Sequence, residues 1–276
     1  MPSPPYEFVD IHCHLLPEID DGASSLAESL AMARMAVDDG ITHTVVTPHQ
    51  LGNFQQNTGP LVRERVQNLQ AALDAEGIPL KIHGGGDVRI EEGMLDGIRA
   101  GEVMTLADRG KHILLELPHE LYYPIEGLVA DLRQAGIQAI LSHPERNQGL
   151  LSKPDIVGQL VEAGCLMQVT AGSLVGTFGP RCQEMSEKLL LSGWVHFLAT
   201  DAHGMKSRRP MLARAFERAS ELVGREIATN LCYHHPKCVV EGTFVDLNTR
   251  TRRQRERPQP ARAKAKRSWL QRLVSA

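Results

Sequence analysis

Short apolar runs rich in β-branched residues alternate with helical patterns along most of the chain. The runs have the length of buried strands, and they predict strands at Phe8–His12, Thr42–Thr47, Leu80–Val88, His112–Leu117, Gln138–Ser142, Cys165–Thr170 and Trp194–Thr200. The intervening patterns predict helices at Ser25–Asp38, Leu61–Glu76, Met94–Arg99, Pro124–Gln134, Pro154–Ala163 and Pro180–Leu191. Seven such units in strict alternation favour an α/β fold whose parallel sheet is closed, or nearly closed, into a barrel.

Glycines mark the ends of several predicted helices, as expected for C-caps: Gly40, Gly77, Gly136, Gly164 and Gly193. A further run, Gly84–Gly86, stands at a strand end rather than before a helix. We therefore expect it to permit a close backbone approach or a bend. No GxGxxG motif follows the first predicted strand, which excludes the usual dinucleotide-binding interpretation.

The composition is typical of a cytoplasmic protein. The 276-residue chain is 42% hydrophobic, which is enough to bury a full core. It contains no apolar run of about 18 residues, the length that spans a membrane, and its N-terminus lacks the basic and apolar regions of a signal peptide. Its five cysteines form no CxxC pair, so we expect a reduced, cytoplasmic setting.

Charge divides the chain near residue 249. Residues 250–276 contain ten Lys or Arg and a single acid, Glu256, so they carry a formal charge of +9 against −12 for the preceding residues. The segment is also rich in Pro, Gln and Ala, a composition typical of a disordered tail. We predict one domain over residues 1–249, followed by a basic tail over residues 250–276.

Side chains of the metal-ligand type follow several predicted strands. They lie in the segments Asp10–His14, Thr47–His49, Leu115–Glu116, Ser142–Pro144 and Thr200–His203. A single histidine at a strand end more often satisfies a backbone group than binds a metal. The carboxyl ends of parallel barrel strands, however, converge on one face, and residues two apart, such as His12 and His14, share a strand face. Together these segments predict a site for more than one metal ion.

The chemistry of these ligands indicates hydrolysis of a phosphate ester. Imidazole and carboxylate without thiolate suit Mn, Fe, Zn or Co. Two or more such ions about 3.5–4 Å apart activate water and hold phosphoryl oxygens. Arg146 and Arg208 closely follow two of the histidines, and a planar guanidinium binds phosphate in a bidentate manner.

On these motifs the chain resembles the PHP (polymerase and histidinol phosphatase) superfamily. More closely, it resembles the manganese-dependent protein-tyrosine phosphatases encoded with bacterial capsule and exopolysaccharide genes. The most specific part is the segment Asp10–Ala23, which reads DIHCHLLPEIDDGA. His143-Pro144-Glu145-Arg146 and Thr200–His203, with Ser207-Arg208 beyond, support the same subfamily. The resemblance covers roughly residues 7 to 245.

The resemblance implies a distorted (β/α)7 TIM-like barrel that holds up to three divalent ions, Mn with Fe, Zn, Co or Mg as alternatives. Carried over by position, the first ion takes His12, His14, Asp201 and a bridging Asp87, the second shares Asp87 with Glu116 and His143, and the third takes Asp21, His49 and His203. Arg146 and Arg208 match the phosphate-binding arginines. Family members usually have Glu where this chain has the shorter Asp87, so bridging would require movement of Gly84–Gly86. Glu91 is the nearest alternative carboxylate.

The same resemblance implies a protein-tyrosine phosphatase whose partner is an autophosphorylated tyrosine kinase of capsule or exopolysaccharide synthesis. Two alternatives remain open: a small-molecule phosphoesterase of the histidinol-phosphate phosphatase type, and an inactive metal-holding scaffold. Cysteine-based phosphatase chemistry is excluded, because no cysteine has Arg at the sixth following position.

The basic tail has no counterpart in the family. Its charge, with Trp269, Leu270, Leu273 and Val274, predicts either peripheral binding to an anionic inner membrane surface or a solvated segment without a partner. Nucleic-acid binding is not expected, because the tail has one aromatic residue and the preceding body is acidic.

The remaining histidines and Cys13 are expected to have structural roles. His119 is the exception, since it shares a loop with Glu116 and is a candidate substrate contact. The others lie at strand starts, in strand interiors or in a terminal loop: His43, His83, His112, His196, His234 and His235.

Overall fold

Strand β1 (Phe8–Cys13) is buried at every position, as expected for a parallel strand that is covered on both faces. All strand pairs are parallel, and they form two sheets with the orders β1-β2-β4 and β3-β5-β6-β7-β8-β9. The computed structural model describes residues 7–245. The remaining strands are Ile41–Val46 (β2), His49–Gln50 (β3), Lys81–Gly84 (β4), Asp87–Arg89 (β5), His112–Glu116 (β6), Gln138–Ser142 (β7), Leu166–Thr170 (β8) and Phe197–Ala199 (β9).

The strands follow one another in the order predicted for a (β/α)7 fold. Two short gaps separate β2 from β3 and β4 from β5, so the nine strands trace seven predicted units. At the other edge, Cys13 forms a parallel bridge with Ala202, and the Asp201 backbone N–H donates to the His12 carbonyl at 2.7 Å. The segment after β9 therefore lies beside β1. The predicted α/β fold is confirmed. Among residues 7–245, however, the hydrogen-bonded strands form two sheets rather than one closed barrel.

The predicted strand Leu80–Val88 is interrupted, because Gly85 and Gly86 separate β4 from β5. A Cβ atom on Gly85 would lie 2.8 Å from Val45 Cγ1, and one on Gly86 would overlap the side-chain carbonyl of Gln50. Only glycine fits such a close approach. The bend predicted for this run is present, and it places Asp87 at the start of β5.

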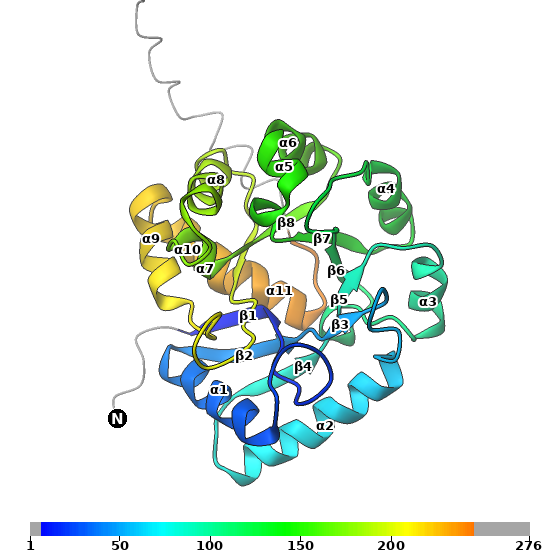
Figure 1. Ribbon diagram of the computed structural model, residues 1–276, viewed down its shortest axis with the longest axis vertical. Coiled ribbons are helices and arrows are strands. Elements are labelled where there is room, and N and C mark those ends of the chain that lie inside the picture. Colours follow the sequence, from blue (N-terminus) through cyan, green and yellow to red (C-terminus); the bar gives the residue numbers. More distant parts are fainter. Residues whose placement is uncertain (1–6, 246–276) are drawn as a thin grey trace, which may run out of the picture. The chain divides into compact units, whose positions relative to one another are not determined.

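Helices surround the strands on the outside (Figure 1). Ser25 caps α1 by accepting a hydrogen bond from the Glu28 backbone at 3.2 Å, as N-cap serines do. The predicted C-cap glycines all have positive φ, between 63° and 99°. The α-helices are Leu26–Asp38 (α1), Gly59–Ala75 (α2), Met94–Ala100 (α3), Glu126–Gln134 (α4), Gln148–Ser152 (α5), Asp155–Glu162 (α6), Ala171–Leu174 (α7), Pro180–Leu191 (α8), Ala213–Val223 (α9), Arg225–Thr229 (α10) and His235–Glu241 (α11). Short 3₁₀ turns occur at Leu106–Asp108 (η1) and Pro144–Arg146 (η2).

The loop predicted around His234 and His235 is wrong, because both residues are helical. Pro236 has no N–H to donate, and such a residue normally ends a helix. Here a π-helical turn, Asn230–His234, precedes it, and the His235 N–H reaches back to the Asn230 carbonyl. The helix therefore continues into α11 with proline in its first turn.

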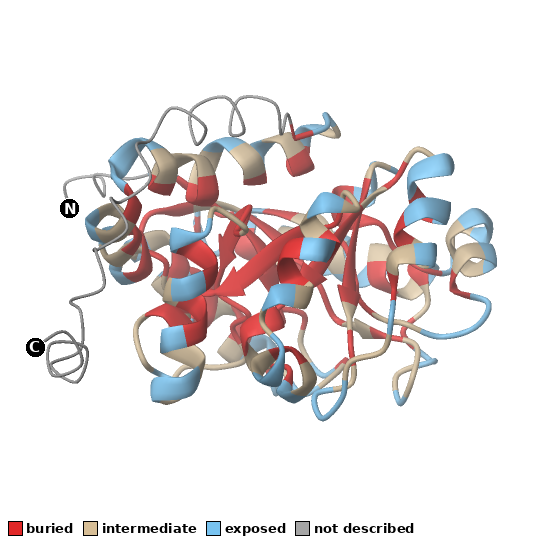
Figure 2. Ribbon diagram, turned by 90° about the horizontal axis from the view of Figure 1, so that it is seen from above, coloured by how far each residue is buried: buried red, intermediate tan, exposed pale blue. Residues whose placement is uncertain are grey.

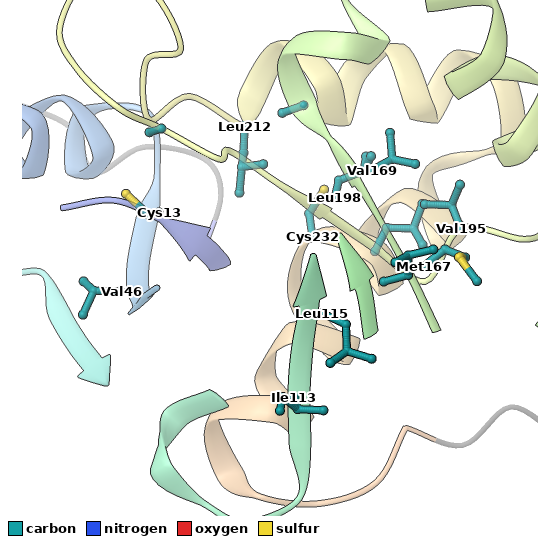
Figure 3. Packing of buried hydrophobic residues seen from close by; sticks show 14 of the residues in the cluster. Cys13, Val46, Ile113, Leu115, Met167, Val169, Val195, Leu198, Leu212 and Cys232 are labelled. Atoms are coloured by element: carbon teal, nitrogen blue, oxygen red, sulfur yellow. The ribbon is translucent and has the colours of Figure 1, made fainter. Parts of the chain in front are cut away.

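The core lies on and between the strands, while the helices expose their outer faces (Figure 2). In β6, Ile113, Leu114 and Leu115 are each fully buried, and full burial of such a side chain contributes about 1.5–3 kcal/mol. Ile113 and Leu115 point the same way into one cluster (Figure 3), as strand alternation requires. Among residues 7–245 no helix is long and apolar enough to cross a membrane. The predicted boundary at 249 and the tail fall outside the described residues.

Candidate metal centre

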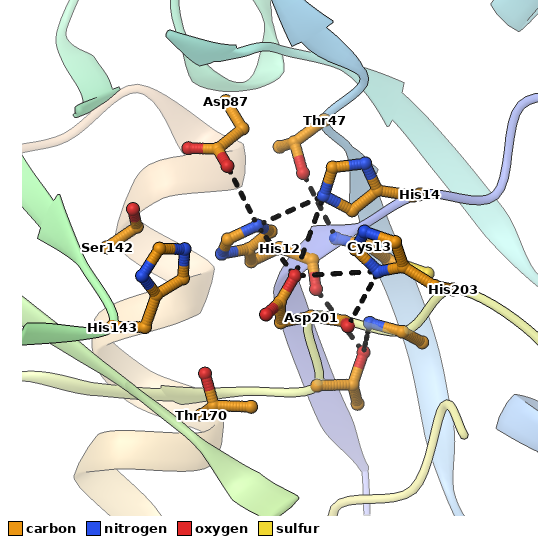
Figure 4. Close-up of polar contacts among 12 residues, drawn as sticks. His12, Cys13, His14, Thr47, Asp87, Ser142, His143, Thr170, Asp201 and His203 are labelled. Atoms are coloured by element: carbon orange, nitrogen blue, oxygen red, sulfur yellow. Dashed lines mark hydrogen bonds and ion pairs between the residues drawn. The ribbon is translucent and has the colours of Figure 1, made fainter. Parts of the chain in front are cut away.

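The predicted ligands come from successive strands and the segments that follow them, and they gather at one site, where Figure 4 labels His12, His14, Asp87, His143, Asp201 and His203. Parallel pairing explains the convergence: His49 in β3 stands beside Asp87 in β5, and Arg89 in β5 stands beside Glu116 in β6. The predicted ligands are His12 in β1, His14 and Asp21 after it, His49 in β3, Asp87 in β5, Glu116 in β6, His143 after β7, and Asp201 and His203 after β9.

His12 lies at the centre of the site and is fully buried. Its Nε2 atom lies 3.2 Å from Asp201 Oδ1, 3.3 Å from His14 Nε2 and 3.5 Å from Asp87 Oδ2. The structure thus brings together the four residues predicted for a first ion. His143 is also close, since one of its ligand atoms groups with those of His12 and Asp201.

A second group gathers at the more open side of the site. Asp21 Oδ1 lies 3.4 Å from His49 Nε2 and 3.4 Å from His203 Nε2. These three residues are the set predicted for the third ion. His14 joins them in one cluster of ligand atoms within 4.8 Å of one another, so its imidazole lies between the two groups.

The set predicted for the second ion, which consists of Asp87, Glu116 and His143, is the least compact. Glu116 Oε1 lies 3.8 Å from His143 Nε2, but the clustered trio that contains Asp87 and Glu116 includes His49 rather than His143. The alternative carboxylate Glu91 lies outside all four clusters of ligand atoms, and its side chain instead accepts from the Gly52 backbone at 3.1 Å. This contact favours Asp87 as the carboxylate of the site.

The outer ring nitrogens of two predicted ligands have buried partners that the sequence analysis missed. Gln168 Oε1 lies 2.9 Å from His12 Nδ1, and Asp20 Oδ2 lies 2.7 Å from His14 Nδ1. Each acceptor fixes the Nδ1–H tautomer and turns Nε2 toward the centre, as partners of metal-bound histidines do. Asp20 belongs to the segment Asp10–Ala23 that carries the family resemblance, but it is not among the predicted ligands. Gln168 gave no signal, because it lies 156 residues away in sequence.

Two imidazoles carry positive charge among the carboxylates. Burial lowers the pKa of His12, but the charges of Asp201 and Asp87 outweigh this effect and raise it to about 9. Burial also lowers the pKa of His49, whereas its hydrogen bond to Asp21 and the charge of Asp87 raise it to about 9. Protons therefore occupy both rings at neutral pH and must leave before either ring binds a metal.

Two other groups are held close to neutral charge. Burial and the neighbouring His203 lower the pKa of His14 to about 4. Burial and the charge of Asp87 raise the pKa of Glu116 to about 7. His14 thus offers a free lone pair at neutral pH, and a nearby cation would restore the charge of Glu116.

Arg146 and Arg208 both contact the carboxylate of Asp201, which is 1% exposed. Arg208 lies 2.6 Å from Asp201 Oδ1 through Nη2, and its Nε donates to the Asp201 carbonyl at 3.2 Å. Their side chains are 13% and 23% exposed. The predicted phosphate-binding residues are therefore at the edge of the ligand cluster. Burial raises the pKa of Asp201, but the charge of His12, followed by those of Arg208 and Arg146, holds it well below its usual range.

Backbone strain concentrates at the same place. Among the described residues, seven non-glycine residues have positive φ, and three of them are His143 (32°), Asp201 (50°) and Arg208 (46°). A non-glycine residue in this region costs about 1–3 kcal/mol and persists where the surroundings hold it, often at functional sites. These backbone angles change the direction of the side chains where the chain leaves β7 and β9.

The donor set fits divalent cations. Both carboxylate oxygens of Asp87 and the Nε2 atom of His203 are buried without a hydrogen-bond partner, which is costly unless another group satisfies them. The 3.2–3.8 Å separations between donor atoms resemble the distance of about 3–3.5 Å between two ligands bonded to one ion at about 2.1 Å. The metal assignments themselves remain predictions.

Three of the histidines predicted to have structural roles pair with side chains outside the ligand cluster. His43 pairs with His83 at 3.1 Å, and His112 Nε2 lies 3.0 Å from Gln138 Oε1, all away from the ligand cluster. Cys13 is buried in the core at 1% exposure. His119 is exposed, and partial burial together with the charge of Arg146 lowers its pKa. Its contact with substrate stays a prediction.

The chain is similar to several proteins of known family. Tyrosine-protein phosphatase YwqE of Bacillus subtilis is 38% identical over 202 residues, which are 72% of this chain and 79% of YwqE. Tyrosine-protein phosphatase CpsB of Streptococcus pneumoniae is 24% identical over 238 residues, 84% of this chain and 98% of CpsB.

A solved structure extends the similarity to three dimensions. It belongs to a study of YwqE from Bacillus subtilis and CpsB from Streptococcus pneumoniae, which are described as unique metal-dependent tyrosine phosphatases. It matches with a TM-score of 0.82 and 33% identity over 86% of this chain and 96% of the other. The sequence model of the family described as "Capsular polysaccharide synthesis, CpsB/CapC" matches residues 8–241. The chain therefore belongs to the CpsB/CapC family of capsular polysaccharide synthesis.

Proposed function

We propose that this protein is a metal-dependent phosphatase that hydrolyses phosphotyrosine in a protein substrate. The observation that carries this proposal is the convergence of nine imidazole and carboxylate side chains, beside two arginines, in a chain of the CpsB/CapC family. Its relatives YwqE and CpsB bear the name tyrosine-protein phosphatase.

We propose Mn²⁺ as the resident metal, because mixed imidazole and carboxylate ligands without thiolate suit it. Bound at this site, such ions supply an activated water and cationic stabilisation of phosphoryl oxygens. The proposed ligands are His12, His14, Asp87 and Asp201 for one ion, Asp87, Glu116 and His143 for a second, and Asp21, His49 and His203 for a third.

The residues of the chain have distinct tasks in this proposal. Gln168 and Asp20 hold two imidazoles in the required tautomer. Asp87 supplies the buried negative charge between the groups, since its Oδ2 lies 3.5 Å from both His12 Nε2 and His49 Nδ1. These distances support Asp87 as the carboxylate shared by the two groups of ligands.

Arg146 and Arg208 bind the phosphoryl group. Each guanidinium offers parallel N–H donors that match two phosphoryl oxygens. Both lie on the carboxylate of Asp201, which is itself a proposed ligand. A phosphate that enters the site therefore meets two cationic side chains at the edge of the ligand cluster.

The physiological substrate in this proposal is an autophosphorylated tyrosine kinase of capsule or exopolysaccharide synthesis. The family description links the chain to capsular polysaccharide synthesis. We further propose that the basic residues of 250–276 hold the enzyme at an anionic inner membrane surface, near such a kinase. Residues 250–276 lie outside the part of the chain that the structure describes.

Hydrolysis by the purified, chelator-treated protein tests the function directly. We expect Mn²⁺ to restore release of phosphate from a phosphotyrosine peptide, with much slower release from a matched phosphoserine peptide and from histidinol phosphate. Efficient turnover of histidinol phosphate alone would instead indicate a small-molecule phosphoesterase. Absence of turnover with every divalent ion would leave only a metal-holding scaffold.

A further inference from the structure

Arg146 has a second contact besides Asp201. Its guanidinium carbon lies 4.5 Å from the centre of the Phe178 ring, within the range of a cation–π interaction. The Arg146 side chain is only 13% exposed, so little solvent screens this attraction. The Arg146 guanidinium thus lies over the ring of Phe178, a residue that is not a candidate metal ligand.

Phe178 stands on a tightly folded connection between β8 and α8. The Thr177 N–H donates to the Gly172 carbonyl at 2.8 Å, and the Gly179 N–H donates to the Gly176 carbonyl at 3.1 Å. Gly176 and Gly179 have φ of 86° and 85°, a conformation that glycine adopts at little cost. The two glycines therefore set the turn that presents Phe178.

The backbone of α7 leaves room for the Phe178 ring. A Cβ atom on Gly172 would lie 3.1 Å from Phe178 Cε2, which is closer than a side chain normally approaches. The ring thus packs against the helix backbone at Gly172 while it contacts Arg146. This packing restricts the positions that the ring can adopt.

A buried carboxylate ties the turn that carries Arg146 to the same connection. Glu145, the preceding residue, is fully buried, and its Oε1 accepts from the Thr170 backbone at 3.0 Å. Thr170 ends β8 immediately before α7. This hydrogen bond links the η2 turn to the end of β8, from which the segment that presents Phe178 continues.

We propose that Phe178 is a positioning residue that holds the Arg146 guanidinium in its phosphate-binding orientation. The inference rests on the proposed function, in which Arg146 binds the phosphoryl group. An unrestrained arginine loses rotamer freedom when it binds a ligand, which weakens binding. The Phe178 ring pre-orders the guanidinium at the edge of the ligand cluster and so reduces that loss.

Substitution at Phe178 tests this role. Phe178→Leu keeps apolar bulk against Gly172 but removes the aromatic face, and Phe178→Tyr keeps the face. We expect Phe178→Leu to lower kcat/KM for a phosphotyrosine peptide by about three- to thirtyfold and to weaken binding of inorganic phosphate, measured by calorimetry, by a similar factor. Phe178→Tyr should keep kcat/KM and the affinity for phosphate close to those of the wild type.

Phe244 provides a matched control. Lys111 lies 5.3 Å from the centre of its ring, but Lys111 is next to the start of β6, at the opposite end from Glu116. Phe244→Leu should leave kcat/KM and phosphate affinity unchanged. If Phe178→Leu does not give a cooperative thermal transition, Phe178→Met supplies a second apolar replacement without an aromatic face.

A double-mutant cycle with Arg146→Ala separates positioning from a general structural effect. We expect Phe178→Leu to cause no further loss in the Arg146→Ala background. Two results would overturn the inference and leave the proposed function intact. In one, Phe178→Leu causes an equal loss in the wild-type and Arg146→Ala backgrounds. In the other, Phe178→Leu behaves as wild type although Arg146→Ala is impaired. Wild-type kinetics of Arg146→Ala would overturn the phosphate-binding role itself.

Discussion

Replacement of Arg208 by alanine is the change from which the phosphate-binding proposal makes its clearest prediction. The side chain reaches the buried Asp201 carboxylate at 2.6 Å and the Asp201 carbonyl at 3.2 Å. It is 23% exposed, so the guanidinium lies between the ligand cluster and solvent, where a phosphate ester would arrive.

The size of the effect follows from the bonds that would be lost. A charge-assisted hydrogen bond contributes about 1.5–3 kcal/mol, and a factor of ten corresponds to about 1.4 kcal/mol. Partial exposure of Arg208 screens its charge and favours the lower half of this range. We therefore expect kcat/KM for a phosphotyrosine peptide to fall about ten- to fortyfold.

The neighbouring Arg209 gives a control of the same size and charge. Its side chain is exposed, and its backbone carbonyl accepts from Met211 at 2.9 Å, a bond that alanine preserves. Steady-state kinetics on Arg208→Ala, Arg208→Lys and Arg209→Ala, with metal content measured in each, form the assay. Arg208→Lys should recover only part of the loss, because an ammonium lacks the planar fork.

Two results would refute this reasoning. Equal kinetics for Arg208→Ala and Arg209→Ala would show that Arg208 is an ordinary surface cation. A loss of activity that accompanies loss of bound metal would show that Arg208 supports Asp201 rather than the substrate.

Three further predictions concern the metal ligands and the tail. Asp87→Glu should retain metal stoichiometry and activity while Asp87→Asn loses both, since only the amide removes the buried charge; equal metal titrations would show that Asp87 is not a ligand. The pKa of His12 and of His49 is about 9, so each ring releases a proton on binding, and apparent metal affinity should rise as pH increases from 7 toward 9; calorimetry that detects no proton release would contradict this. Truncation after Thr249 should leave hydrolysis of a small phosphate ester unchanged and reduce co-sedimentation with anionic liposomes at low salt, whereas equal sedimentation would exclude a membrane tether.

Most of the framework was predictable because the strands are short, apolar and separated by helices with clear ends. Gln138–Ser142 and Pro180–Leu191 were predicted with their observed bounds. The region after residue 210 was not predicted. There α9 buries Ala215, Phe216, Ala219 and Val223, an amphipathic pattern that the sequence carries and that was overlooked. The π-helical turn before Pro236 contradicts the usual expectation for a residue that precedes proline.

The ligand cluster was predictable because parallel strands bring their carboxyl ends together, so spacing along the chain implies proximity in space. That argument cannot identify partners that enter from elsewhere. Gln168 lies inside β8 and Phe178 lies in a turn after α7, and neither residue type indicates a role in a metal site. The grouping of His49 with Asp87 and Glu116 also depended on the bend at Gly85, whose geometry the sequence leaves open.

The most direct test of metal dependence is turnover of a phosphotyrosine peptide by chelator-treated protein, followed as Mn²⁺ is added back. We expect no turnover without metal and full recovery with it. We expect no recovery in His12→Ala, His143→Ala or Asp201→Ala, each folded by circular dichroism, because each lacks a proposed ligand. Turnover that persists in the chelated protein, or near-normal rates in all three variants, would contradict the assignment of this site as a metal-dependent phosphatase centre.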